Sequence, residues 1–288
     1  MNRQDKHLLL FRRRSLSEMM GATTDFLRRH RLMWLLYVGL PLLPCCLLLA
    51  LMKSPNEDAE SFNVICSVLV GFDFDLGTGI FTFEALLFTV ALTWVLWSVH
   101  ALLRLVVDSP GDGAGHAAVR ASLRRLLPKA CVLFVVVYVA ARLLDIESGL
   151  ALLLILLLLP LSFFPPAWML HDDRFDMSLS RSLNIAFSQW GYLVVVILVM
   201  GFMVFMLRGT VQLPTLLLEN SIDTLTQLDE RPEGWYLVLQ YIAETLSWWA
   251  FFMGLSILAI PVAYVYGNGV EKENGDSLVD DIYQFENL

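Results

Sequence analysis

Residues 33–51 read MWLLYVGLPLLPCCLLLAL, a run without Asp, Glu, Lys, Arg or His. A helix of this length crosses a hydrocarbon core of about 30 Å. Other runs of comparable length and apolar character follow, and together they give six predicted spans: 33–51, 82–105, 127–144, 149–170, 192–207 and 243–266. The sequence therefore predicts an all-α polytopic membrane protein, a bundle of six transmembrane helices.

Composition agrees with this interpretation. The chain has 288 residues, of which 57% are hydrophobic and only 17% charged. A soluble domain of this size does not bury so much apolar surface. No nucleic-acid partner is predicted.

The positive charges are sorted by loop. Sixteen of the 20 Lys and Arg residues lie in the N-terminal region, in or beside the segments that join spans two and three and spans four and five, or after span six; the other four lie in or beside the remaining loops. Because cytoplasmic loops carry the excess of Lys and Arg, both termini are predicted to be cytoplasmic, in a bacterial inner membrane. The predicted organisation is a basic N-terminal region (1–32), a six-span domain (33–266) and an acidic cytoplasmic tail (267–288).

Short amphipathic stretches precede spans one, three and five, at residues 16–27, 118–127 and 179–190. Each is too polar to span and is predicted to lie in the cytoplasmic interface. The unit of interfacial helix, span, outer loop and span would then occur three times, unless the recurrence is a coincidence of common juxtamembrane helices. The basic residues predicted to contact anionic lipid headgroups are Arg12, Arg13, Arg14, Arg28, Arg29, Arg31, Arg120, Arg124, Arg125 and Arg181.

Prolines interrupt two of the predicted spans. Each one removes a backbone donor and frees a carbonyl that needs a new partner in lipid. The resulting kinks either line a cavity between helices or serve as ordinary packing devices. The predicted kink positions are Pro41, Pro44, Pro160, Pro165 and Pro166.

The centres of the predicted spans lack Asp, Glu, Lys and Arg, which argues against an ion-coupled carrier. Charged residues occur near the outer ends, where they either pair between helices or reach separately to water. The candidates for outer ion pairs are Glu84, Arg142, Asp145, Arg208 and Glu244.

The acidic tail carries apolar residues at short spacing. They either dock on a protein partner or belong to a disordered segment. The residues concerned are Leu278, Val279, Ile282, Tyr283, Phe285 and Leu288.

No catalytic residues, cofactor or metal site are predicted. His171, Asp172 and Asp173 adjoin one another and lie near His100 and Arg104 in the predicted layout. Adjacent carboxylates in a loop are more typical of a solvated turn than of a metal site.

Residues 175–184 read FDMSLSRSLN and are followed by Trp190 and Gly191 at the start of span five. This stretch resembles uncharacterised bacterial six-span proteins related to the membrane domain attached to some glycerophosphodiester phosphodiesterases. The resemblance implies the six-span layout. The catalytic domain of those enzymes is not present in this sequence, so the resemblance implies no phosphodiesterase activity.

The leading interpretation is a non-catalytic scaffold, assembly factor or accessory subunit that contacts lipids and a protein partner on the cytoplasmic side. The second is a lipid or amphiphile transporter or channel-like subunit with an apolar groove near the kinked spans one and four. A membrane enzyme is the third.

Overall fold

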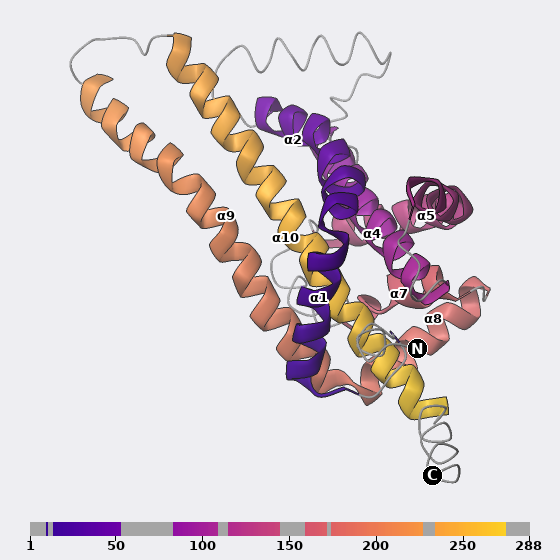
Figure 1. Ribbon diagram of the computed structural model, residues 1–288. Coiled ribbons are helices and arrows are strands. Elements are labelled where there is room, and N and C mark those ends of the chain that lie inside the picture. The colour runs from indigo at the N-terminus through magenta and orange to yellow at the C-terminus, as the bar shows by residue number, and fades with distance from the viewer. Residues whose placement is uncertain are drawn as a thin grey trace.

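The computed structural model describes residue 10 and residues 14–52, 83–108, 115–144, 159–171, 174–226 and 234–274. Every element within these ranges is helical, as predicted (Figure 1). The elements are α1 (Leu16–Trp34), the π-helical segment η2 (Leu35–Gly39), α2 (Leu40–Met52), α4 (Phe83–Asp108), α5 (His116–Leu144), α7 (Phe164–Leu170), α8 (Phe175–Ser188), α9 (Trp190–Thr226) and α10 (Gly234–Asn274).

Four helices of the described part are long and apolar enough to cross a membrane: Leu16–Met52, Ala85–Val107, Trp190–Leu213 and Val238–Lys272. They contain the predicted spans 33–51, 82–105, 192–207 and 243–266, nearly in full. The sequence predicts these four spans because each apolar run is longer than the roughly 10–14 residues typical of a buried helix in a globular core.

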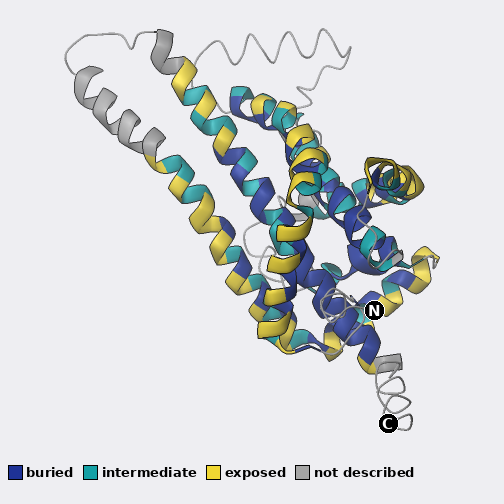
Figure 2. Ribbon diagram, in the orientation of Figure 1, coloured by how far each residue is buried: buried dark blue, intermediate teal, exposed yellow. Residues whose placement is uncertain are grey.

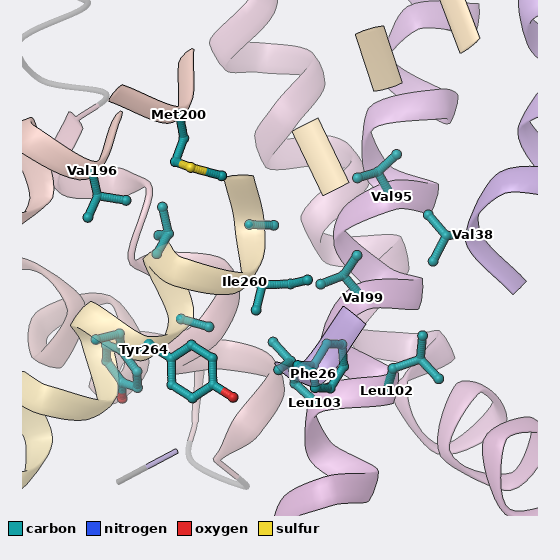
Figure 3. Close-up of a cluster of buried hydrophobic side chains, with 14 of the residues drawn as sticks. Phe26, Val38, Val95, Val99, Leu102, Leu103, Val196, Met200, Ile260 and Tyr264 are labelled. Carbon is teal, nitrogen blue, oxygen red and sulfur yellow. The ribbon is translucent and has the colours of Figure 1, made fainter. Parts of the chain in front are cut away.

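Helix α10 lies at the centre of the bundle. It packs against α1, α2, α4, α7, α8 and α9, and its second half is buried almost throughout (Figures 1 and 2). Figure 3 shows Ile260 of α10 among side chains from α4, α9 and η2, including Val99 and Val196. The core of the described bundle is therefore organised around one helix.

The first long helix is built from α1, η2 and α2. A capping box begins it: Ser15 N–H donates to Glu18 Oε2 (2.8 Å), and Glu18 N–H donates to Ser15 Oγ (3.4 Å). Met19, Ala22, Thr23 and Phe26 form its buried face, and their spacing matches one side of a helix. The helix is interrupted at His30, whose backbone leaves the helical region (φ −107°, ψ 17°).

Two tryptophan side chains donate to backbone carbonyls near the prolines of this helix. Pro41 cannot donate to the carbonyl of Tyr37, four residues earlier, and Trp94 Nε1 of α4 donates to that oxygen instead (3.1 Å). Trp249 Nε1 of α10 donates to the carbonyl of Gly39 (2.9 Å), five residues before Pro44. The irregular backbone is thus satisfied by its neighbours, as a membrane helix requires.

The predicted spans 127–144 and 149–170 look different in the structure. Residues 127–144 are helical within α5, which packs against α4 and is seen end-on in Figure 1, unlike α9 and α10. Residues 145–158 lie outside the described part. The six-span count therefore stays a prediction.

The described end of the predicted fourth span is not one continuous helix. The chain turns at Ser162–Phe163, and α7 begins directly afterwards with Pro165 and Pro166 in its first turn. Proline is favoured there because the first helical N–H groups have no acceptor within the helix. These two prolines start a helix and do not kink one, which differs from the sequence prediction.

Candidate functional site: a buried polar junction at one end of the bundle

Polar and charged side chains gather where α1 begins, α4 and α10 end, and α7 and α8 lie between them (Figure 1). The buried members that the structure describes include Arg14, Arg104, Ser178, Ser182, Gln189, Asn268 and Glu271. Polar groups buried to this degree are costly without hydrogen bonds. Their partners therefore indicate what the junction does.

Two cations hold the C-terminal end of α7. Arg104 of α4 donates from Nη1 to the carbonyl of Met169 (3.0 Å), and Lys129 of α5 donates from Nζ to the carbonyls of Trp168 (2.8 Å) and His171. Trp168 Nε1 donates back to the carbonyl of Lys129 (3.2 Å). The last carbonyls of a helix lack intrahelical donors and carry partial negative charge, so cations are favoured there. We call Arg104 and Lys129 the α7 clamp.

Arg14 joins the start of the chain to the end of α10. Its backbone N–H donates to Asn268 Oδ1 (3.2 Å), and its guanidinium carbon lies 4.9 Å from the centroid of the Tyr264 ring. The side chain is only 8% exposed. Arg14 was predicted to contact lipid headgroups. The structure places it inside the junction, because α10 continues past the predicted end of span six and covers it.

Two glycines let α10 pass through this crowded region. A Cβ on Gly267 would overlap the backbone carbonyl of Leu10, and one on Gly269 would overlap Ile185 of α8. A backbone neighbour cannot rotate away as a flexible side chain can. The helix therefore reaches Asn274 in close contact with both neighbours, although the sequence predicted a separate tail from residue 267.

His100 of α4 is the buried histidine of the junction. Its Nδ1 lies 2.6 Å from the carbonyl oxygen of Leu96, so Nδ1 carries the proton and donates. Its Nε2 is buried without a hydrogen-bond partner. Arg104 lies one turn along the same helix, and its Nη1 donates to the carbonyl of Met169, two residues before His171.

No family model, curated protein or solved structure matches this chain. None of these comparisons links the chain to the membrane domain of glycerophosphodiester phosphodiesterases, so that resemblance stays a prediction.

The remaining arginines with predicted lipid contacts lie on the surface where they are described. They belong to three different helices, α1, α5 and α8. The exposed residues are Arg28, Arg29, Arg31, Arg120, Arg124, Arg125 and Arg181. Arg12, Arg13 and the predicted docking residues Leu278, Val279, Ile282, Tyr283, Phe285 and Leu288 lie outside the described residues.

Arg208 and Glu244 are the candidate ion-pair residues whose side chains the structure describes. Asp145 and the side chains of Glu84 and Arg142 lie outside the described part. Arg208 of α9 contacts aromatic rings of α10: its guanidinium carbon is 4.6 Å from the centroid of Trp248 and 5.3 Å from that of Phe251. The predicted pairs stay predictions.

Sequence reasoning missed the α7 clamp and the role of Gly267 and Gly269. Lys129 stood within a predicted span, and its partners are backbone carbonyls, which no side-chain pattern marks. Arg104 gave a weak signal, since a cation at the end of an apolar helix needs an acceptor. Chemically, the junction joins helices through cations that donate to backbone carbonyls.

Proposed function

We propose that this chain is a non-catalytic integral membrane protein that acts as a scaffold, assembly factor or accessory subunit in a bacterial inner membrane. In this proposal both termini are cytoplasmic, and the polar junction lies at the cytoplasmic end. The observation that carries it is the α7 clamp. Arg104 and Lys129 donate to backbone carbonyls of the same chain, which is the arrangement of a structural platform.

The exposed arginines support a lipid-facing role for that platform. Basic residues near an anionic membrane surface contribute about 1 kcal/mol each to binding. The proposal expects them to face headgroups on the cytoplasmic side. The test uses the intact chain, purified in detergent and mixed with phosphatidylglycerol vesicles. Replacing Arg120 and Arg124 with Gln should reduce the amount of protein that floats with the vesicles. Flotation equal to that of wild type would count against the contact.

Two junctions between helices support the proposed repeat of interfacial helix and span. His30, within the first long helix, has φ −107° and ψ 17°, and Gln189, between α8 and α9, has φ −111° and ψ 17°. The same backbone change therefore redirects the chain before two of the candidate spans. The third copy would lie in α5, which continues without such a residue through Pro128.

The proposed protein partner docks on the acidic tail. Residues 267–274 are helical, and the described ones among them are mostly buried, so a deletion that tests docking must begin after Asn274. A chain of residues 1–274 should fold with the thermal stability of the full chain and lose a stoichiometric partner on purification in mild detergent. A chain with residues 275–288 in scrambled order keeps the charge and is the matched control. Equal partner recovery from all three chains would refute the docking role.

The transporter interpretation receives less support. A groove beside the kinked first span needs an unfilled kink, whereas Trp94 and Trp249 occupy the backbone acceptors next to Pro41 and Pro44. The prolines of this helix are better explained as packing devices.

A further inference from the structure

At the end of α10 opposite the polar junction, one stripe of α10 faces Arg208 of α9. Glu244, Ser247, Trp248 and Phe251 are spaced three and four residues apart and therefore share a face. Trp248 and Phe251 contact the guanidinium directly. The same face meets α9 again seven residues beyond Ser247, where a Cβ on Gly254 would lie 3.0 Å from Val204.

Arg208 and two residues of this stripe carry buried hydrogen-bond donors that have no acceptor. Arg208 Nε, Ser247 Oγ and Trp248 Nε1 are all buried without a hydrogen-bond partner. Ser247 is 0% exposed and Trp248 is 9% exposed. By contrast, the indole N–H groups of Trp34, Trp94, Trp97 and Trp249 each donate a hydrogen bond.

The ring contacts do not meet the needs of the guanidinium. An aromatic face attracts the positive charge but offers no lone pair to the N–H groups. Arg208 lies five residues before the end of the candidate span Trp190–Leu213, and Phe205 on the preceding turn is 70% exposed. A guanidinium in this position is matched in charge and geometry by phosphate oxygens, which lipid headgroups present at the end of a span.

We propose that Arg208, Trp248 and Ser247 form a binding site for a phosphate group, with Arg208 as the charged anchor and the other two as neutral donors. The occupant is a phospholipid headgroup or a free phosphate. The carboxylate of Glu244, one turn before Trp248, disfavours a dianion, so the site favours a singly charged phosphate group. This site is independent of the proposed scaffold function and lies at the other end of the bundle.

The test uses the full chain in a phosphate-free maltoside detergent. The probes are phosphatidylglycerol, diacylglycerol with the same acyl chains and inorganic phosphate. Bound lipid is counted by native mass spectrometry, and the melting temperature is followed in parallel. The variants are Arg208→Gln, Trp248→Phe, Ser247→Ala and Glu244→Gln, and the matched control is Thr210→Ala, whose exposed hydroxyl donates only to the carbonyl of Met206.

Phosphatidylglycerol should bind wild type and Thr210→Ala about tenfold more tightly than diacylglycerol does, the change expected from one hydrogen bond to a charged group. Arg208→Gln should remove that preference, and Trp248→Phe and Ser247→Ala should reduce it about threefold each. Glu244→Gln should bind at least as tightly as wild type. Displacement of phosphatidylglycerol by millimolar inorganic phosphate would assign the site to free phosphate, and its absence would assign the site to the lipid.

Equal binding of phosphatidylglycerol and diacylglycerol would overturn the site. An Arg208→Gln chain that keeps the wild-type preference would also overturn it. A third contradicting result is an equal loss of stability in Arg208→Gln and Glu244→Gln with no effect on lipid binding, because that result would indicate an internal ion pair. If Arg208→Gln does not fold, Trp248→Phe decides, because it keeps an aromatic ring and the arginine and removes the N–H donor with the five-membered ring of the indole.

Discussion

The cations at the two ends of the bundle are used differently. At one end Arg104 and Lys129 donate to the carbonyls that close α7. At the other end Arg208 lies over two rings and has no hydrogen bond within the described part of the chain. The first two cations already donate to oxygens of this chain, whereas Arg208 contacts aromatic rings and takes its acceptor, in our proposal, from outside. The comparison separates a structural end from a ligand-binding end.

The strongest way to break this comparison is to remove the α7 clamp. The double change Arg104→Ala with Lys129→Ala leaves the carbonyls of Trp168, Met169 and His171 without side-chain donors. Each unsatisfied buried group costs about 1–3 kcal/mol, so we expect a loss of about 4 kcal/mol or no folded protein at all. Size-exclusion chromatography with fluorescence detection, after heating, measures the effect. A melting temperature within about 2 °C of wild type corresponds to a loss of only about 0.5 kcal/mol and would contradict a structural role.

Close packing of the structural end can be tested at α10. Gly267→Ala should destabilise by about 1–3 kcal/mol because the new methyl group meets the carbonyl of Leu10. Gly201→Ala on α9 is the matched control, since nothing lies within 4 Å of its Cβ position. The melting temperatures of the two variants should therefore differ. Similar values would indicate that the junction is loosely packed.

The middle of the bundle offers a smaller effect. Trp94→Phe removes the donor to the carbonyl of Tyr37 and should cost about 1 kcal/mol. Pro41→Ala restores a backbone donor to the same oxygen, so Trp94→Phe should cost less in that background. A double-mutant cycle on the free energy of unfolding measures this coupling. Strict additivity would show that the indole does not compensate for the proline.

Sequence alone predicted the parts of this molecule that depend on long apolar runs. Residues 192–207 and 243–266 had the hydropathy and length of spans, and the structure places them in α9 and α10. The extension of α10 to Asn274 was missed because residues 267–274 are polar and glycine-containing. Their burial comes from contacts with Leu10 and Ile185, which are distant in sequence.

The site residues were likewise predicted only where the sequence pattern itself marks them. Arg208 was one of the charged residues predicted either to pair between helices or to reach water, and the structure shows its guanidinium against Trp248 and Phe251. The clamp partners of Lys129 are backbone atoms of α7, a helix hidden inside a run that was read as one span. Hydropathy reports length and polarity, whereas these contacts depend on how the helices cross.

The contrast between the two ends is tested most directly by melting Arg104→Ala and Arg208→Gln with and without phosphatidylglycerol. The account predicts that Arg104→Ala is destabilised to the same extent in both conditions. Arg208→Gln should match wild type without lipid and should not gain the increase in melting temperature that lipid gives to wild type. The account would be contradicted if lipid changed the destabilisation of Arg104→Ala while Arg208→Gln gained the same increase in melting temperature from lipid as wild type.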